Sequence, residues 1–508
     1  MLQPQSNETQ AVKRAPTARV AQEHAPEPAP AATSTPPPRP PGPRGLPIIG
    51  SALPALRDPL SFLKKAHAEH GDVVRFRFGH LDYHMVSDPE AIRHVLVDNA
   101  KNYTKSRNYD GLKLVLGRGL LTSEGDEWRK QRKLAQPAFH RDRLAGLASR
   151  MSEATGDMLA RWRAEDDGAG AFCAHEEMMR LTFRIVGLTL LSTDVDGDAR
   201  EVGDALGVAM HFANDYVESL VPIPTWLPTP DNFRFRKAMK TLDRVVYRII
   251  QERRVSGTEH GDLLDMLMSA REEGTDRAMS DVQLRDELLT LVLAGHETTA
   301  NLLSFTFMML SRHPDVARRL HDEAVSVLGG GDGRPATLED VPRLSYAKMV
   351  LEEVLRLYPP AWSFERQATA PDVIGGYAVD RGAIVAVCPY VLHRHPLYWD
   401  NPEGFDPERF TPERSAGRPR YAYVPFGAGP RTCIGNHFAM MEAQIILAMV
   451  AREYRLDLVS AHDVVLDPVI TLRPKTGIKV ERRRWGCPAP RTPSGSRSAA
   501  RAGAPRSD

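Results

Sequence analysis

The sequence predicts a mainly α-helical protein with small β-sheets. Long segments keep the three- and four-residue apolar spacing of helices that bury one face: residues 144–164, 177–193, 202–218, 233–254 and 281–311. Strand-like runs are short, and two of them follow each other closely at 73–78 and 84–86. Hydrophobic residues make up 42% of the chain and charged residues 26%, as in an ordinary globular protein.

The two ends of the chain differ in composition from its middle. Residues 1–44 are rich in Pro, Ala, Ser and Thr, and residues 481–508 are rich in Arg, Ser, Pro and Ala. Such segments bury too little apolar surface to offset the entropy of ordering them, so both are expected to be disordered tails. Residues 45–480 remain as one predicted domain. A chain of 508 residues could hold two or three domains, but it is also long enough for one core that encloses a cofactor.

Charge and cysteine usage exclude several classes of protein. Lys and Arg number 66 and Asp and Glu 65, which leaves a formal net charge of +1 and no field that would attract nucleic acid. The cysteines show no C-x-x-C pairing, and so few in a long chain favour free thiols in a reducing compartment, the cytoplasm. They are Cys173, Cys388, Cys433 and Cys487.

The longest apolar run, residues 288–310, is long enough to span a bilayer. His296, Glu297 and Asn301 lie near its middle, and a carboxylate at the centre of a bilayer costs roughly 3 kcal/mol. The N-terminus also lacks the apolar core of a signal peptide. We therefore expect a buried core helix and no transmembrane anchor.

The first part of the domain should contain a helix at 59–70, the paired strands, and a helix at 88–98. A turn at 117–121 leads into a helix at 126–134, on which Trp128 and Arg132 are four residues apart and share one face. Taken alone, this pair favours a solvated basic face with a packed tryptophan.

Residues 221–230 alternate prolines with apolar side chains. An exposed apolar loop marks a substrate entrance or a weak membrane contact. A loop that packs on its own helices is an equally good interpretation.

The centre of the long helix at 281–311 reads Ala294-Gly295-His296-Glu297-Thr298-Thr299. Polar side chains in a buried helix are costly unless they are used or paired. Glycine destabilises a helix interior by about 1 kcal/mol relative to alanine. Residues that destabilise a buried helix in this way are typical of a functional site. The alternative is a kink that packs against a neighbouring helix.

Farther along, residues 344–357 should form a helix with Glu353 and Arg356 on one face. Such a pair on a surface stabilises a helix by about 0.2–0.5 kcal/mol. Turns at 375–376 and 381–382 indicate a hairpin over residues 373–384.

A single cysteine lies in a loop punctuated by glycines, Phe426-Gly427-Ala428-Gly429-Pro430-Arg431-Thr432-Cys433-Ile434-Gly435, which opens onto a helix at 436–451. Glycines let the backbone take positive φ and approach a flat ligand closely. The unpaired N–H groups at the helix start favour a thiolate at Cys433. A thiolate in an apolar, amide-lined pocket is a suitable axial ligand for haem iron, whereas a lone cysteine in a loop is more often structural.

The loop resembles the haem-binding loop of the cytochrome P-450 superfamily, Phe-Gly-x-Gly-x-Arg-x-Cys-x-Gly, at every fixed position. The resemblance covers roughly residues 45–480. It includes Trp-x-x-x-Arg at Trp128, the oxygen-activation motif that ends at Thr298, Glu-x-x-Arg at Glu353, and a Pro-Glu-Arg-Phe run that contains Arg409. It implies the cytochrome P-450 fold, with haem b held between the long helix and the cysteine loop.

The resemblance also implies roles for individual residues. Cys433 would be the axial ligand of the haem iron, and Thr298 and Glu297 would direct oxygen activation and proton delivery. Glu353, Arg356 and Arg409 would lock the chain beneath the haem without a catalytic role. The remaining cofactor-binding residues, the propionate contacts included, would be Trp128, Arg132, Arg366, Phe426 and Arg431.

The implied enzyme is a monooxygenase, which inserts one atom of dioxygen into a C–H or C=C bond and releases the other as water. We see no flavin or ferredoxin module, so electrons should come from a separate ferredoxin and its reductase, as in the bacterial members that lack an anchor, and we expect a monomer. Apolar residues around 109–116, 211–230 and 361–364, together with Leu293, favour a lipophilic substrate such as a fatty acid or terpenoid. A thiolate-haem isomerase or dehydratase that acts on peroxides, and a non-catalytic haem sensor, are the alternatives.

Overall fold

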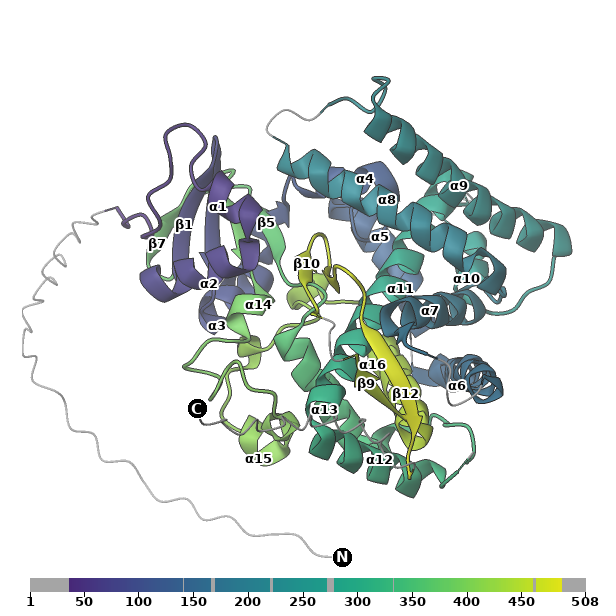
Figure 1. Ribbon diagram of the computed structural model, residues 1–508. Coiled ribbons are helices and arrows are strands. Elements are labelled where there is room, and N and C mark those ends of the chain that lie inside the picture. Colours follow the sequence, from purple (N-terminus) through teal and green to yellow (C-terminus); the bar gives the residue numbers. More distant parts are fainter. Residues whose placement is uncertain are drawn as a thin grey trace, which may run out of the picture. The chain divides into compact units, whose positions relative to one another are not determined.

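Helix α11 (Asp281–Arg312) runs through the helical part of the fold, and it is the longest helix among the residues that the structure describes (Figure 1). The hydroxyl of Ser280 caps its first turn by accepting the N–H of Gln283. Nearly every side chain from Leu284 to Leu310 is buried, because other helices pack around it on several sides. The expectation of a buried core helix is therefore confirmed.

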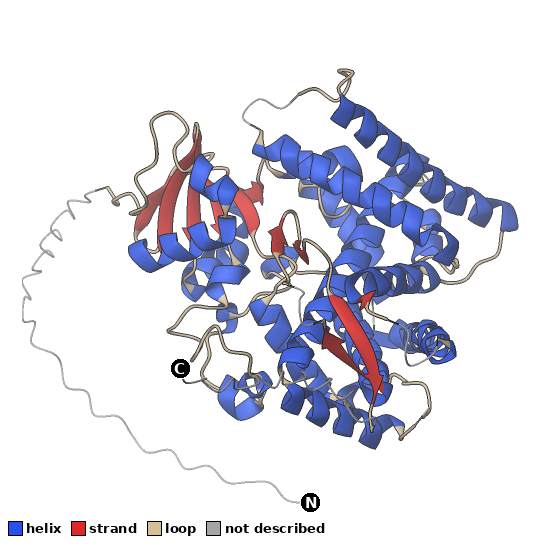
Figure 2. Ribbon diagram, viewed as in Figure 1, coloured by secondary structure: helices blue, strands red, loops and turns tan. Residues whose placement is uncertain are grey.

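The structure is a computed structural model, and it describes residues 36–139, 141–165, 170–219, 223–271, 278–331, 333–459 and 463–486. Helices make up most of the fold, and the largest group of strands gathers in one sheet (Figure 2). The α-helices are α1 (Ala52–Arg57), α2 (Pro59–His70), α3 (Pro89–Arg93), α4 (Tyr109–Leu116), α5 (Gly125–Ala135), α6 (Arg141–Ala164), α7 (Ala174–Leu190), α8 (Ala199–Glu218), α9 (Pro230–Ser256), α10 (Leu263–Ser269), α11 (Asp281–Arg312), α12 (Pro314–Leu328), α13 (Ser345–Leu357), α14 (Pro389–Leu392), α15 (Pro412–Ser415) and α16 (Asn436–Glu453).

The strands form small sheets, the largest of which has the order β1-β2-β8-β5-β3. Within it β2 and β8 are parallel, and the other neighbours are antiparallel. A three-stranded sheet has the order β4-β12-β9, and β6-β7 and β10-β11 form two hairpins. The strands are β1 (Val73–Phe78), β2 (Leu81–Val86), β3 (Tyr103–Lys105), β4 (Phe172–Cys173), β5 (Phe364–Ala368), β6 (Asp372–Ile374), β7 (Tyr377–Val379), β8 (Ile384–Val387), β9 (Tyr454–Leu458), β10 (Leu466–Pro468), β11 (Leu472–Pro474) and β12 (Lys479–Arg484).

The predicted long helices are confirmed to within about one turn at each end. The predicted helix at 88–98 is α3 followed by a π-helical segment, His94–Asp98. The predicted hairpin over 373–384 is wrong in its second half. Only β6 and β7 pair as a hairpin, whereas β8 joins the large sheet between β2 and β5.

The fold extends beyond both predicted domain boundaries. The carbonyl of Pro38 accepts the N–H of Ala378 (2.9 Å), and that of Pro41 accepts the N–H of Arg75 (2.8 Å). Strand β12 runs to Arg484, past residue 480. Hydrogen bonds of the fold thus begin before residue 45 and continue past 480. Residues 1–35 and 487–508, with Cys487, lie outside the described residues.

The predicted pair Glu353 and Arg356 lies at the centre of a buried ion network, not on the surface. Arg356 makes two bonds to the carboxylate of Glu353 (2.6 and 2.7 Å), and Arg409 approaches the same carboxylate at 3.3 Å. All three side chains are almost fully buried. Arg356 also donates to the carbonyls of three later residues, which ties α13 to the chain before the cysteine loop: His393, Pro402 and Gly404.

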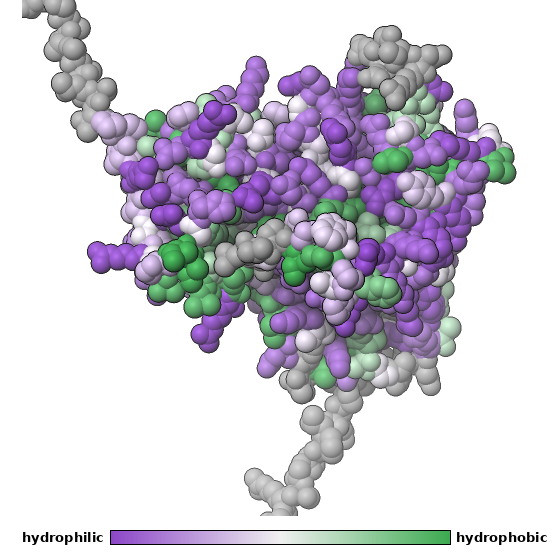
Figure 3. Space-filling view, turned by 90° about the horizontal axis from the view of Figure 1, so that it is seen from above, coloured by the Kyte–Doolittle hydropathy of each residue, from purple (hydrophilic) through white to green (hydrophobic). Residues whose placement is uncertain are grey.

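Apolar side chains reach the surface in a few places, and Figure 3 shows them as patches on an otherwise largely hydrophilic face. In the loop predicted at 221–230, Ile223 and Trp226 are exposed, the latter by 73%, whereas residues 221 and 222 lie outside the described residues. Within the described ranges, every helix is too short or too polar to cross a membrane.

Candidate active site

The cysteine loop is closed by hydrogen bonds within itself. The N–H of Cys433 donates to the carbonyl of Phe426 (2.9 Å), and the hydroxyl of Thr432 donates to the carbonyl of Gly429 (2.7 Å). A Cβ at Gly429 would come within 1.8 Å of the carbonyl oxygen of Leu96. Glycine is therefore required here by the close packing of the loop against Leu96, not by a bound ligand. Gly427 has φ of +68° and open space where its Cβ would be, as expected beside a flat ligand.

The thiol of Cys433 is accessible, although protein surrounds it closely. Burial raises its pKa above the ordinary value, and the opposing effects of the Gly435 N–H and the Arg132 charge do not outweigh burial. The N–H of Gly435 at the helix start lowers the pKa, as expected, but without a bound metal burial has the larger effect. A bound metal ion would supply the missing stabilisation, since a coordinating thiol loses its proton outright.

Several cations converge near the loop with few anions to balance them. Arg431 pairs with Glu124 (2.7 Å) and lies 3.9 Å over the ring of Trp128. Its Nη1 is buried without a hydrogen-bond acceptor among the described residues. Arg132 donates to the carbonyl of Thr432 (2.9 Å), which fixes α5 to the cysteine loop.

Two further cations face each other at the edge of the large sheet. Lys105 on β3 lies opposite Arg366 on β5 in the strand register. Burial and the charges of Arg366 and Arg431 lower the pKa of Lys105. Arg366 is buried, and its Nη1 donates to the carbonyl of Glu365 (2.8 Å). Neighbouring buried cations of this kind call for an anionic ligand.

These observations fit a haem with two carboxylates. The cations Lys105, Arg366 and Arg431 would meet the carboxylates, and Trp128 and Arg132 of α5 lie against residues of the cysteine loop. On α11, Ala294 is exposed and Thr298 half-buried, although the helix around them is buried. Phe426 is half-buried at the start of the cysteine loop. Sequence reasoning missed Lys105, because a lysine in a short polar run carries no distinguishing signal.

The two predicted catalytic residues have different surroundings. Thr298 donates its hydroxyl back to the carbonyl of Ala294 (2.7 Å). Glu297 is buried, and its Oε1 accepts the hydroxyl of Thr471 (2.5 Å) from the hairpin β10-β11. Burial raises the pKa of Glu297, against the opposing effects of Thr471 and the Arg473 charge. A carboxyl whose pKa is raised holds its proton more readily and can act as a proton donor.

The remaining residues of the α11 motif have packing roles. A Cβ at Gly295 would come within 3.1 Å of Val186, so the glycine also allows α7 to pack closely. His296 is buried against the ring of Phe183, and burial lowers its pKa to about 3. It therefore stays neutral and receives no catalytic role.

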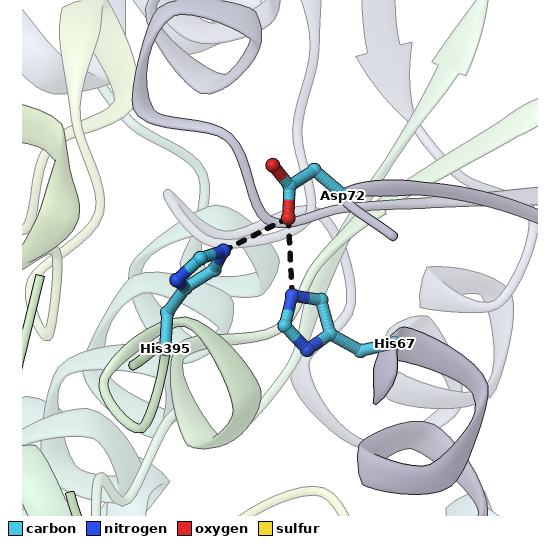
Figure 4. A group of neighbouring side chains, drawn as sticks. All are labelled: His67, Asp72 and His395. Atoms are coloured by element: carbon cyan, nitrogen blue, oxygen red, sulfur yellow. Dashed lines mark hydrogen bonds and ion pairs between the residues drawn. The ribbon is translucent and has the colours of Figure 1, made fainter. Parts of the chain in front are cut away.

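A second group of ligand-type side chains lies elsewhere, where Nε2 of His67 and Nε2 of His395 approach the same oxygen of Asp72 at 3.1 and 2.9 Å (Figure 4). The N–H of Leu397 donates to Nδ1 of His395 (3.1 Å). That nitrogen keeps its lone pair, so Nε2 of the neutral ring carries the proton that Asp72 accepts. A metal would need the lone pair of Nε2. The group is thus a hydrogen-bonded bridge from α2 to the chain after α14.

The comparisons with known proteins define the class of protein to which this fold and site belong. Residues 40–481 match the family described as Cytochrome P450. The chain therefore belongs to the cytochrome P450 family, whose members carry haem and draw electrons from redox partners. It is a cytochrome P450 monooxygenase with relatives in bacteria.

Individual relatives agree with this conclusion. Cyclooctatin synthase of Streptomyces melanosporofaciens is 38% identical over 82% of this chain and 89% of that protein. Cyclooctat-9-en-7-ol 5-monooxygenase of the same species is 35% identical over 84% of this chain and 92% of that protein. Pentalenene oxygenase of Streptomyces avermitilis is 34% identical over 83% of this chain and 92% of that protein. The solved structure of retinoic acid bound cyanobacterial CYP120A1 aligns with a TM-score of 0.79 and 26% identity, over 89% of this chain and 100% of that chain.

Proposed function

We propose that this monooxygenase inserts one oxygen atom from dioxygen into a terpenoid-like substrate, by hydroxylation or epoxidation. The observation that carries the proposal is the accessible thiol of Cys433, in a loop near several cations that have few anions to balance them. The names of the three Streptomyces relatives support the substrate class. The bound haem b would supply the oxygen chemistry.

The residues of the chain divide the work around that cofactor. Cys433 would donate its thiolate to the iron, and Phe426 would pack beside the loop. The carboxylates of the cofactor would be held by the side chains of Lys105, Trp128, Arg132, Arg366 and Arg431. Thr298 would release its bond to Ala294 and donate a hydrogen bond to the reacting oxygen. Glu297 would deliver the proton that the reaction consumes.

The enzyme would also interact with electron-transfer proteins. A ferredoxin and its reductase would deliver electrons to a cytoplasmic, monomeric enzyme whose domain is the part between the two tails. The exposed Ile223 and Trp226 would make at most a weak contact with a membrane.

Replacement of the thiol tests the proposal directly. Cys433→Ser should abolish the red-shifted Soret band of the carbon monoxide complex, because the axial ligand sets the electronic properties of the iron. Wild-type protein with a surrogate ferredoxin pair should form oxygenated product from a panel of cyclic terpenes. An unchanged spectrum in Cys433→Ser would exclude this ligand, and wild-type turnover of fatty acids alone would exclude the substrate class.

Replacement of Thr298 separates oxygenation from peroxide rearrangement. In Thr298→Ala, electron consumption should continue while released hydrogen peroxide rises and product per electron pair falls. Substrate binding should change little, because the lost interaction belongs to the chemical step. Rearrangement of an added hydroperoxide by the wild type without any electron donor would favour the isomerase or dehydratase instead.

A further inference from the structure

The turn between β10 and β11 reaches the buried centre of α11. Thr471, the residue just before β11, places its hydroxyl 2.5 Å from Oε1 of Glu297. Glu297 is only 5% exposed, so few groups can reach its carboxyl. The sequence separation of 174 residues means that only the tertiary fold brings the two side chains together.

The same turn is held at two points by the chain that precedes β5. The N–H of Leu472 donates to the carbonyl of Pro360 (2.9 Å), and Nε1 of Trp362 donates to the carbonyl of Val469 (2.7 Å). These two bonds lie on either side of Thr471 in the sequence. The hydroxyl of Thr471 is therefore fixed in place by backbone anchors rather than by Glu297 itself.

A charged residue follows Thr471 on the same side of the hairpin. Arg473 follows Thr471 by two residues, and alternate residues of a strand face the same side. Nε of Arg473 donates to Asp467 (3.1 Å), its partner in the strand register. The same guanidinium contacts the exposed ring of His211 on α8. The hairpin thus places the charge of Arg473 close enough to lower the pKa of the buried carboxyl of Glu297.

We propose that Thr471 is a positioning residue that holds the carboxyl of Glu297 where it can pass a proton to the site beside Thr298. This inference rests on the proposed function, because it deepens the part played by Glu297. Thr471 itself neither contacts the substrate nor carries the transferred proton.

The surroundings of Glu297 predict the direction in which its pKa should shift when Thr471 is replaced. Burial raises the pKa of Glu297, whereas the hydroxyl of Thr471 and the charge of Arg473 lower it. Two histidines face Arg473 from the helices packed on the hairpin, His175 of α7 and His211 of α8, and burial lowers the pKa of both. Removal of the Thr471 hydroxyl should therefore raise the pKa of Glu297 further.

The test compares Thr471→Val with Thr471→Ser in the haem-loaded enzyme. The infrared C=O band of protonated Glu297 is identified as the band that Glu297→Gln lacks. In Thr471→Val this band should persist to a pH about one unit higher than in the wild type, since a lost hydrogen bond is worth roughly one pKa unit. Product per electron pair should fall about tenfold. Thr471→Ser should restore both values.

Thr306→Val is the matched control, because it removes a buried α11 hydroxyl whose one partner among the described residues is the carbonyl of Leu302. It should leave the infrared band unchanged. If Thr471→Val fails to retain haem, Thr471→Ala carries the same expectations without added bulk. A wild-type band and wild-type coupling in either variant would overturn the role of Thr471. The absence of product from the wild type would instead overturn the proposed function.

Discussion

Two buried glutamates in this fold, Glu353 and Glu297, differ in what surrounds their carboxyl groups. Glu353 is bonded by Arg356, approached by Arg409, and accepts the N–H of Asp406 (2.8 Å). Glu297 accepts one hydroxyl, and burial raises its pKa. A carboxylate that is fully bonded holds chain segments together, whereas one that is sparsely bonded is suited to gain and lose a proton.

The largest effect should come from removing the charge of Glu353. Glu353→Gln keeps the shape of the side chain but leaves Arg356 buried without a counter-charge and Arg409 paired with Asp400 alone. We expect unfolding to become easier by about 3–5 kcal/mol and the protein to lose haem. Urea unfolding and the haem content after gel filtration measure this. Haem-loaded protein with wild-type stability would show that the network is dispensable.

A third buried glutamate, Glu287 on α11, should make stability depend on pH. Burial raises its pKa to about 8, so the folded state keeps a proton that the unfolded state releases near the ordinary value of 4.5. Stability should thus fall as pH rises from about 4.5 to about 8, by about 5 kcal/mol. Glu287→Gln should flatten this dependence in urea titrations at about pH 5 and about pH 9. An equal slope in both proteins would contradict the raised pKa.

Glu297→Gln provides the direct contrast to Glu353→Gln. The buried carboxyl of Glu297 has no arginine bonded to it among the described residues, and the amide can still accept the hydroxyl of Thr471. Unfolding should change by less than about 1 kcal/mol, while product per electron pair falls about tenfold or more. If the two glutamine variants lost equal stability, the contrast between the two sites would be wrong.

The smallest effect should come from a surface ion pair. Arg39 and Asp380 are 3.1 Å apart but more than half exposed. Exposed pairs contribute about 0–1 kcal/mol because water and salt screen them. Arg39→Ala should therefore leave the unfolding midpoint almost unchanged, and high salt should remove any difference. A loss as large as that of Glu353→Gln would mean that burial does not decide the strength of these pairs.

Elements and motifs that depend on residues close together in the chain could be predicted from the sequence. The period of 281–311 predicted α11, and the spacing around Cys433 predicted the loop. Amphipathic α12 was nevertheless missed, and β8 was placed in the wrong pairing, because strand order depends on distant segments. The hydrogen-bond partner of Glu297 could not be predicted either. Nothing in the sequence near Thr471 indicates that its hydroxyl contacts α11. The raised pKa of Cys433 needed the packed structure, because burial is a tertiary property.

The two like charges at the edge of the large sheet bear on how the protein can be produced. Lys105 and Arg366 lie opposite each other on β3 and β5, where like charges repel. A ligand with carboxylates removes that penalty and stabilises the folded chain by mass action. A chain synthesised faster than its cofactor arrives would leave β3, an edge strand, open to pairing with neighbouring chains. The yield of folded protein is therefore expected to follow the supply of haem rather than the rate of synthesis.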